Sequence, residues 1–174
     1  MMTGFREALQ KVKGFVFDVD GVLSPETAIL HPDGDMMRTM NIKDGYAIQY
    51  AIRKGYAMGF ITGGKSKMIA KRLKSLGVEH IYLGSINKLY DFNDFMSKVS
   101  LEPEVILYMG DDIPDLKILN MVGFPTCPAN AAEEIKAISG YVSDKEGGQG
   151  CVRDVIEQVL KLQGKWMEND AFSW

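Results

Sequence analysis

The segment GFVFDVDGV, residues 14–22, decides the fold of this chain. Its first half is a short apolar run rich in Phe and Val, which is typical of a buried strand covered on both faces. Its second half places Asp18 and Asp20 directly after that run and before Gly21. Because side chains two residues apart on a strand point to the same side, we expect the two carboxylates to lie together at a strand end.

Similar apolar runs follow along the chain and alternate with segments of helical periodicity. This alternation predicts an α/β fold, a Rossmann-like doubly wound parallel sheet with helices on both faces. The stretch 23–41 breaks the alternation, and the turn signal PDG at 32–34 predicts an inserted β-hairpin there. Further strands are expected within 56–64, 78–84, 104–112 and 122–127, and helices within 3–12, 44–54, 65–76, 87–98, 113–121, 130–138 and 150–163.

The length and composition are those of one globular domain. A chain of 174 residues with 46 % apolar and 25 % charged residues has enough apolar content for a core and no sign of disorder. We expect a single domain over 1–163 and a C-terminal tail over 164–174.

Charge and cysteine content exclude several classes of partner. Lys plus Arg is 20 against 23 for Asp plus Glu, so the basic surplus of a nucleic-acid binder is missing. No apolar run approaches the roughly 18 residues of a membrane span, and residues 1–14 match neither a signal peptide nor an anchor. Cys127 and Cys151 are too few for a disulfide framework. We therefore expect a cytoplasmic protein with no membrane or nucleic-acid partner.

Polar clusters follow three of the predicted strands. The first is Asp18 with Asp20, the second is TGG at 62–64, and the third is GDDIPD at 110–115. In an open parallel sheet the ligand crevice lies at the carboxyl ends of the strands. Fold stability alone does not call for three such clusters at one edge, so they indicate a functional site.

The acidic residues of these clusters predict a metal ion. Neighbouring carboxylates raise each other's pKa unless a cation lies between them, and oxygen ligands without His or Cys favour Mg²⁺ over Zn²⁺. A lone Asp after a strand is usually a turn residue or a helix cap. That explanation does not extend to four carboxylates at two strand ends, namely Asp18, Asp20, Asp111 and Asp112.

Three further groups suit a phosphate. Lys88 could neutralise a phosphate oxygen, and Thr62 offers a hydroxyl, while Gly63 and Gly64 let backbone N–H groups approach an anion. The set predicts phosphoryl transfer to an aspartate. One carboxylate attacks phosphorus to form an aspartyl phosphate, and the second protonates the leaving alcohol and then activates water.

These motifs resemble the haloacid dehalogenase superfamily. DVDGV at 18–22, ITGG at 61–64, Lys88 and GDDIPD at 110–115 are similar to its four motifs, in order, and the resemblance covers about residues 11–163. It implies that Asp18 is the nucleophile and Asp20 the general acid and base, with Thr62 and Lys88 completing the catalytic group. It also implies Mg²⁺ held by Asp18, the backbone carbonyl of Asp20 and Asp111, with Asp112 and Asp115 orienting the metal waters and the loop.

Because only the 23–41 hairpin interrupts the chain, it resembles the capless branch of that superfamily. NIKDGYAI at 41–48, GSINKL at 84–89 and GGQGCVRDVIE at 147–157 are similar to the 3-deoxy-D-manno-octulosonate 8-phosphate phosphatases of lipopolysaccharide sugar biosynthesis. The resemblance implies a homotetramer whose hairpins join at its centre and whose subunits help to close each other's sites.

The residue after the TG pair leaves the substrate open. The related nine-carbon 3-deoxy-nonulosonate 9-phosphate phosphatases tend to carry Glu there, and many octulosonate phosphatases carry Arg, whereas this chain has Gly64. A nine-carbon sugar acid phosphate therefore stays an alternative substrate.

Four more residues are candidate substrate contacts, each with a plainer alternative. Arg72 could bind the substrate carboxylate or belong to a solvated basic helix face. Lys43 and Asp44 could contact the sugar, although a role as N-cap of the helix over 44–54 would also explain Asp44. Arg153 could reach a neighbouring subunit or simply begin a helix.

The hairpin indicates self-association, because a lone hairpin is only marginally stable in water and an apolar patch marks an interaction site. The apolar residues of the hairpin are Ile29, Leu30, Met36, Met37 and Met40.

Two other functions remain as alternatives. A receiver-like signalling domain is also phosphorylated on Asp with Mg²⁺ nearby, but it has no acid and base two residues after the phosphorylated Asp, where this chain has Asp20. A noncatalytic assembly module would have lost a motif residue, and none is lost.

Overall fold

The structure, a computed structural model, describes residues 9–34 and 36–173. Its main sheet has six strands in the order β5-β4-β1-β6-β7-β8, and every neighbouring pair is parallel. The doubly wound parallel sheet is therefore confirmed, although the short last strand was not predicted. The strands are β1 (Gly14–Phe17), β4 (Ala57–Thr62), β5 (His80–Leu83), β6 (Ile106–Met109), β7 (Phe124–Cys127) and β8 (Tyr141–Val142).

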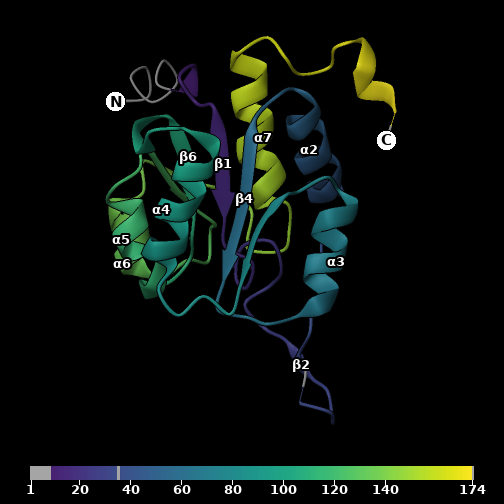
Figure 1. Cartoon of the computed structure of the whole chain (residues 1–174), viewed down its shortest axis with the longest axis vertical. Coiled ribbons are helices and arrows are strands. Elements are labelled where there is room, and N and C mark those ends of the chain that lie inside the picture. Colours follow the sequence, from purple (N-terminus) through teal and green to yellow (C-terminus); the bar gives the residue numbers. More distant parts are fainter. Residues whose placement is uncertain (1–8, 35, 174) are drawn as a thin grey trace.

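Helices cover both faces of this sheet (Figure 1). Alternate residues of β1 serve the two faces: Phe15 and Phe17 pack into the core under α2, α3 and α7, whereas Val16 packs into the core under α4, α5 and α6. This alternation follows from the two-residue period of a strand and explains why its sequence is apolar throughout. The helices are α2 (Ile42–Arg53), α3 (Lys67–Ser75), α4 (Lys88–Val99), α5 (Leu116–Leu119), α6 (Glu133–Ile138) and α7 (Cys151–Leu162).

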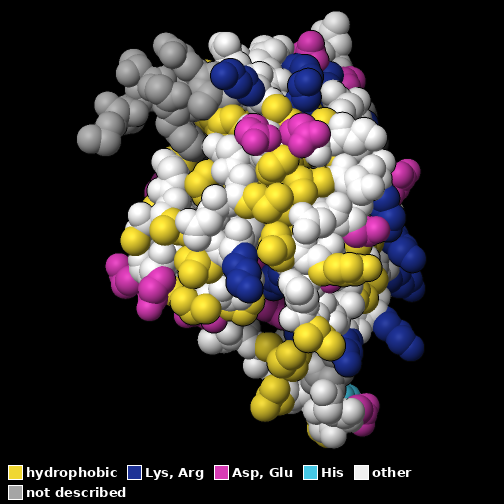
Figure 2. Space-filling model, turned by 60° about the vertical axis from the view of Figure 1, so that its left-hand side comes forward, with side chains coloured by type: hydrophobic (Ala, Val, Ile, Leu, Met, Phe, Trp, Pro, Cys, Tyr) yellow, Lys and Arg dark blue, Asp and Glu magenta, His cyan; other side chains and the backbone are white. Residues whose placement is uncertain are grey.

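The predicted hairpin is confirmed. Strands β2 (Ile29–Leu30) and β3 (Met36–Met37) pair antiparallel and project from the end of the body at which β1 and β4 finish (Figure 1). Their four apolar side chains are exposed, from 40 % for Met36 to 77 % for Leu30. Figure 2 shows yellow side chains on this projection. The expectation that Met40 belongs to the same exposed set is wrong, because Met40 is partly buried against the core under α2 and α7.

Helix α2 begins earlier than expected. Asn41 is its N-cap and accepts the N–H of Lys43 at 2.9 Å, so the assignment of Asp44 as N-cap is wrong. Asp44 lies in the first turn of the helix, fully buried, and its Oδ1 accepts the N–H of Arg153 at 2.7 Å. Asp44 therefore caps the start of α7 rather than the start of its own helix.

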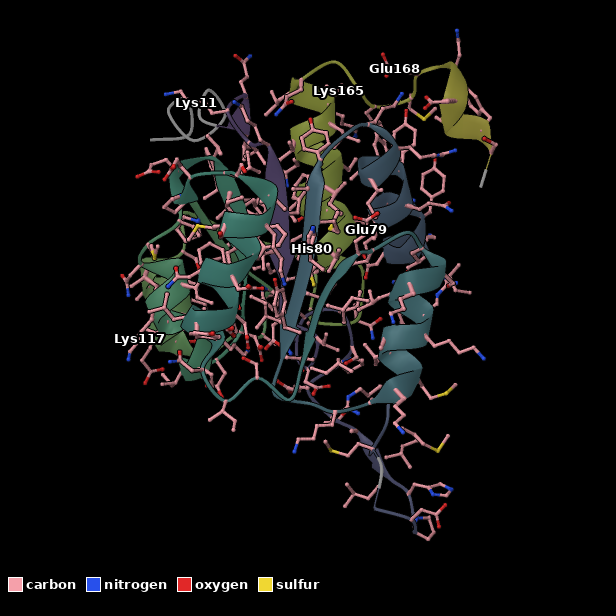
Figure 3. All side chains as sticks on the ribbon, in the orientation of Figure 1. Lys11, Glu79, His80, Lys117, Lys165 and Glu168 are labelled. Carbon is pink, nitrogen blue, oxygen red and sulfur yellow. The ribbon has the colours of Figure 1, made fainter. Side chains whose placement is uncertain are left out.

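Lys11, Lys165 and Glu168 lie at the opposite end of the molecule from the hairpin (Figure 3). Most of the helix expected over 3–12 lies outside the described residues. Near the C-terminus, Lys54, the C-cap of α2, pairs with Glu168 at 2.6 Å and with Asp170 at 2.5 Å. Among residues 9–34 and 36–173, no helix is both long and apolar enough to cross a membrane.

Candidate active site

Asp18 is the first residue beyond β1, at the centre of the sheet. Its N–H still donates to the carbonyl of Met109 at 3.0 Å, which extends the pairing with β6 by one residue. Its side chain is buried: Oδ1 accepts the N–H of Val19 at 2.6 Å and Oδ2 accepts the ammonium of Lys88 at 2.7 Å. The strand end therefore holds one carboxylate in a fixed orientation.

Lys88 links two carboxylates. It opens α4, whose N-cap is Asn87, and its buried ammonium donates to Asp18 and also to Oδ1 of Asp115 at 2.8 Å. The same oxygen of Asp115 accepts the hydroxyl of Tyr108 at 2.6 Å. Tyr108 is on β6, beside β1, so the sheet itself brings these groups together.

Burial and repulsion raise the pKa values of these acids. Burial first, and then the charge of Asp115, raise the pKa of Asp18 to about 8, against the opposing effect of Lys88. The same two causes raise the pKa of Asp111 to about 7. Burial alone would lower the pKa of Lys88, but the charges of Asp18 and Asp115 outweigh it and raise that pKa. The site carries more negative charge than one ammonium balances.

The arrangement fits a divalent cation with oxygen ligands. Carboxylate oxygens of Asp18, Asp111 and Asp115 lie within 4.8 Å of one another. Close approach depends on Gly21, which has a φ of +86°, because a Cβ there would lie 1.9 Å from Oδ2 of Asp111. A hard cation at this point would supply the missing positive charge, as Mg²⁺ prefers carboxylate, carbonyl and water oxygens.

Asp115 is also fully engaged by the protein. Besides Lys88 and Tyr108, it accepts the N–H of Asp111 at 3.2 Å, so it holds the acidic loop in place. Asp112, in contrast, is exposed at the start of a short 3₁₀ turn, Ile113–Asp115.

A cavity of about 750 Å³ opens above Asp18. Thr62 ends β4 there, and its hydroxyl accepts the N–H of Gly64 at 3.0 Å. A second hollow of about 480 Å³ lies on the acidic side and is lined by Asp111, Asp112 and Asp115. The predicted residues that line the larger cavity are Asp18, Asp20, Thr62, Gly63, Gly64 and Lys88.

Four predicted substrate contacts lie outside that cavity. Lys43 and Arg153 line a separate cavity of about 420 Å³. Asp44 is buried beneath the start of α7. Capping of that helix is enough to explain the presence of this carboxylate. Arg72 lies on α3 against α2, since its Nη2 is 3.0 Å from the point where a Cβ on Gly45 would lie. One copy of the chain does not bring these four side chains to Asp18.

Two cations at the site were missed. Arg38 reaches from the hairpin to Asp20, and Lys117 lines the large cavity from α5, where Figure 3 shows it at the side of the molecule. Arg38 follows two Met residues within the predicted hairpin, and Lys117 begins no motif. A single basic residue in such a context gives no signal in the sequence.

Comparison with known proteins agrees with this geometry. Residues 78–156 match the family model of haloacid dehalogenase-like hydrolases. The chain is 35 % identical over 156 residues to the 3-deoxy-D-manno-octulosonate 8-phosphate phosphatase of Escherichia coli K12. The aligned region covers 90 % of this chain and 83 % of the relative.

Solved structures of such phosphatases share the whole fold. The enzyme of Moraxella catarrhalis, solved in complex with a magnesium ion, a phosphate ion and a KDO molecule, superposes with a TM-score of 0.91 at 34 % identity and covers 95 % of both chains. The cobalt-bound enzyme of Haemophilus influenzae gives a TM-score of 0.89 at 26 % identity and covers 95 % of this chain and 98 % of its own. The chain therefore belongs to the haloacid dehalogenase-like hydrolases, in the family that includes the 3-deoxy-D-manno-octulosonate 8-phosphate phosphatases.

Proposed function

We propose that this protein is a Mg²⁺-dependent phosphatase that releases phosphate from 3-deoxy-D-manno-octulosonate 8-phosphate through an aspartyl phosphate. The observation that carries the proposal is the buried contact of Asp18 with Lys88, 2.7 Å long, at the floor of a cavity that Asp20 and Thr62 also line. A buried carboxylate at a cavity floor is expensive unless it has a function, because charge is poorly solvated there.

In the first half of the reaction, Asp18 attacks the phosphorus atom and the sugar alkoxide leaves. The ammonium of Lys88 and the hydroxyl of Thr62 offset the charge of the phosphoryl oxygens as the anionic nucleophile approaches. Asp20, at the rim, protonates the leaving oxygen. The bond from phosphorus to the sugar oxygen breaks as the bond to Asp18 forms.

In the second half, water hydrolyses the aspartyl phosphate and Asp20 takes the proton of that water. Asp18 and Asp111, with the backbone carbonyl of Asp20, are the proposed ligands of Mg²⁺, and Asp112 and Asp115 the groups that orient its waters and the loop. When bound, the ion supplies positive charge between the nucleophile and the phosphate.

The substrate assignment is supported by the relatives. The enzymes that match over more than four fifths of their length are named for the eight-carbon sugar acid phosphate, and the Moraxella enzyme binds phosphate with KDO. The chain differs from many octulosonate phosphatases at Gly64, so the nine-carbon homologue is the natural competitor to test.

Phosphate release from three substrates tests the proposal. The eight-carbon sugar acid phosphate, its nine-carbon homologue and p-nitrophenyl phosphate would be compared by kcat/KM in the presence of Mg²⁺. We expect the eight-carbon substrate to be hydrolysed best. A preference for the nine-carbon compound would reassign the substrate, and no release from any of the three would refute the phosphatase itself.

Assembly is a further part of the proposal. We propose a homotetramer in which the hairpins pack together and in which Lys43, Arg72 or Arg153 of one copy approaches the site of another. Two features support it: the four exposed apolar side chains of β2 and β3, and the distance of these basic residues from the chain's own cavity. The proposed unit is one domain over 1–163 with a tail over 164–174, in a cytoplasmic enzyme of lipopolysaccharide sugar biosynthesis.

A further inference from the structure

Arg38 directly follows β3. Among residues 36–38, it is the one whose side chain turns inward. Its neighbours Met36 and Met37 are exposed residues, whereas the side chain of Arg38 is exposed by only 4 %. A guanidinium withdrawn from water this far needs compensating partners. The partner it reaches is Asp20, which is 18 positions away in the sequence.

The contact between Arg38 and Asp20 is two-pronged. Nε of Arg38 donates to Oδ1 of Asp20, and Nη2 donates to Oδ2 at 3.0 Å. The third nitrogen, Nη1, donates to the carbonyl of Met36 at 2.9 Å, which ties the fork to the hairpin backbone. Such a bidentate pair fixes the plane of the carboxylate as well as its position.

Asp20 has little else to hold it. Its side chain is 40 % exposed, and besides Arg38 it accepts only a long hydrogen bond of 3.3 Å from the hydroxyl of Ser24 among the described residues. Asp18, by comparison, is buried and bonded to both Val19 and Lys88. An acid and base that is half exposed can rotate away from the reacting oxygen unless a second group restrains it.

The same guanidinium lies beside the turn over 62–64, which is the proposed phosphate contact. A Cβ on Gly64 would lie 3.1 Å from Nη2 of Arg38, 3.2 Å from Oδ2 of Asp20 and 3.3 Å from the hydroxyl of Thr62. The arginine, the acid and the hydroxyl therefore converge on the backbone of Gly64, where a longer side chain would compete with Arg38 for the space.

We propose that Arg38 is a positioning residue that holds Asp20 as an oriented carboxylate for the second half of the reaction. The inference rests on the proposed function. In that half, water attacks the phosphorus of the aspartyl phosphate and its proton passes to Asp20. The bond from phosphorus to the Asp18 oxygen breaks, and its electron pair returns to the Asp18 carboxylate. Asp20 must be an unprotonated acceptor there, which is the form that a guanidinium fork binds.

p-Nitrophenyl phosphate separates this role from phosphate binding. Nitrophenolate leaves without a proton, so its first release reports formation of the aspartyl phosphate, and steady turnover reports its hydrolysis. In Arg38→Met we expect the rate of the first release to stay within about twofold of the wild type, while steady turnover falls about tenfold to a hundredfold, part of the 10²–10⁴ that an acid and base group contributes. Arg38→Lys, which keeps the charge but loses the fork, should recover only part of the loss.

The control is Arg53→Met on α2, where the arginine contacts Ser173 far from the cavity; both of its rates should match the wild type. Unchanged steady turnover in Arg38→Met would overturn the inference. So would a loss of equal size in both phases, or a rise in KM alone, since either result would make Arg38 a phosphate-binding group. A wild type without any turnover would overturn the proposed function, and the positioning role with it.

Discussion

The carboxyl edge of the sheet and the hairpin treat their side chains in opposite ways. At the edge, charged groups are buried and paired: Lys88 bonds Asp18 at 2.7 Å and Asp115 at 2.8 Å. On the hairpin, apolar groups face water, with Leu30 exposed by 77 % and Ile29 by 68 %. Each region reverses the usual placement of its residue types, and each reversal costs free energy. The lesson is that stability alone explains neither region. The proposed phosphatase chemistry explains the edge, and the proposed contact with a second copy of the chain would explain the hairpin.

Among substitutions at this edge, replacement of the proposed nucleophile should lower turnover most. Asp18→Asn should lower turnover by at least about 10⁴-fold, because an amide cannot form the phosphoryl ester, and effects of this size follow loss of a nucleophile. The fold should survive, since Asn keeps an oxygen for the N–H of Val19. Steady-state phosphate release with circular dichroism checks both points. Full activity in the variant would remove Asp18 from the mechanism.

Removal of the metal tests the charge balance at the same edge. We expect a chelator to abolish turnover and added Mg²⁺ to restore it, because Asp18, Asp111 and Asp115 crowd their oxygens within 4.8 Å. Ca²⁺ should restore activity poorly, since its larger and looser coordination shell misplaces the nucleophile relative to phosphorus. Turnover that persists in a sample shown to be metal-free by elemental analysis would contradict this prediction.

The hairpin can be tested without altering the edge. In the proposed assembly, Ile29→Lys with Leu30→Lys should convert the oligomer into smaller species in light scattering, because burial of each large apolar side chain is worth about 1.5–3 kcal/mol and a charge there opposes it. Turnover of the sugar acid phosphate should fall with the mass. As a matched control, Lys98→Met on α4 changes one exposed charge without touching the hairpin.

Two results would break the comparison between edge and hairpin. A double variant that is monomeric and retains full activity and selectivity would show that no neighbour helps to form the site. A wild-type protein that is already monomeric would leave the exposed apolar side chains without the explanation offered for them.

The smallest expected effect is on the pH dependence of stability and comes from Asp44, which lies in α2 just after the hairpin. Burial raises the pKa of Asp44 to about 6, although the N–H and charge of Arg153 lower it. The folded state then binds the proton more tightly than the unfolded chain, whose value is 3.8. Ionisation as the pH rises from about 4 to about 6 therefore destabilises the fold, by up to about 3 kcal/mol, and the loss is complete above that range.

Asp44→Asn should remove this part of the pH dependence while it keeps an acceptor for Arg153. Urea unfolding of both proteins at pH 4.5 and pH 7 measures it. Identical pH dependence in the two proteins would contradict the assignment. An increase in KM for the sugar with unchanged stability would instead favour direct contact with the substrate.

The sequence predicted the edge far better than the groups around it. Asp18, Asp20, Thr62 and Asp111 lie at strand ends, and parallel pairing of β1 with β4 and β6 carries strand ends to one place regardless of detail. Lys88 opens the helix that follows β5, so the same topology brings it to this edge. The placement of these side chains is thus a consequence of topology, which periodicity reveals.

The N-cap of α2, strand β8 and the position of Arg38 could not be predicted, because local sequence patterns do not reveal the contacts that determine them. Asn41 and Asp44 are both good N-caps, and packing against α7 decided between them. Strand β8 has two residues, too few for any period to appear. Arg38 reaches Asp20, 18 positions earlier in the sequence, and no spacing rule distinguishes it from a solvated arginine. Sequence patterns capture regular elements, whereas these features arise from single tertiary contacts.

The phosphorylated intermediate provides the most direct test of the central claim. Asp20→Asn leaves Asp18 and Lys88 in place but removes the group proposed to activate water. With p-nitrophenyl phosphate and Mg²⁺, acid-quenched protein should gain the mass of one phosphoryl group, and peptide mapping should locate it at Asp18. The same treatment of a variant that also carries Asp18→Asn should add nothing. Phosphate found at another residue, or phosphate release at the wild-type rate with no gain in mass, would contradict the aspartyl-phosphate mechanism.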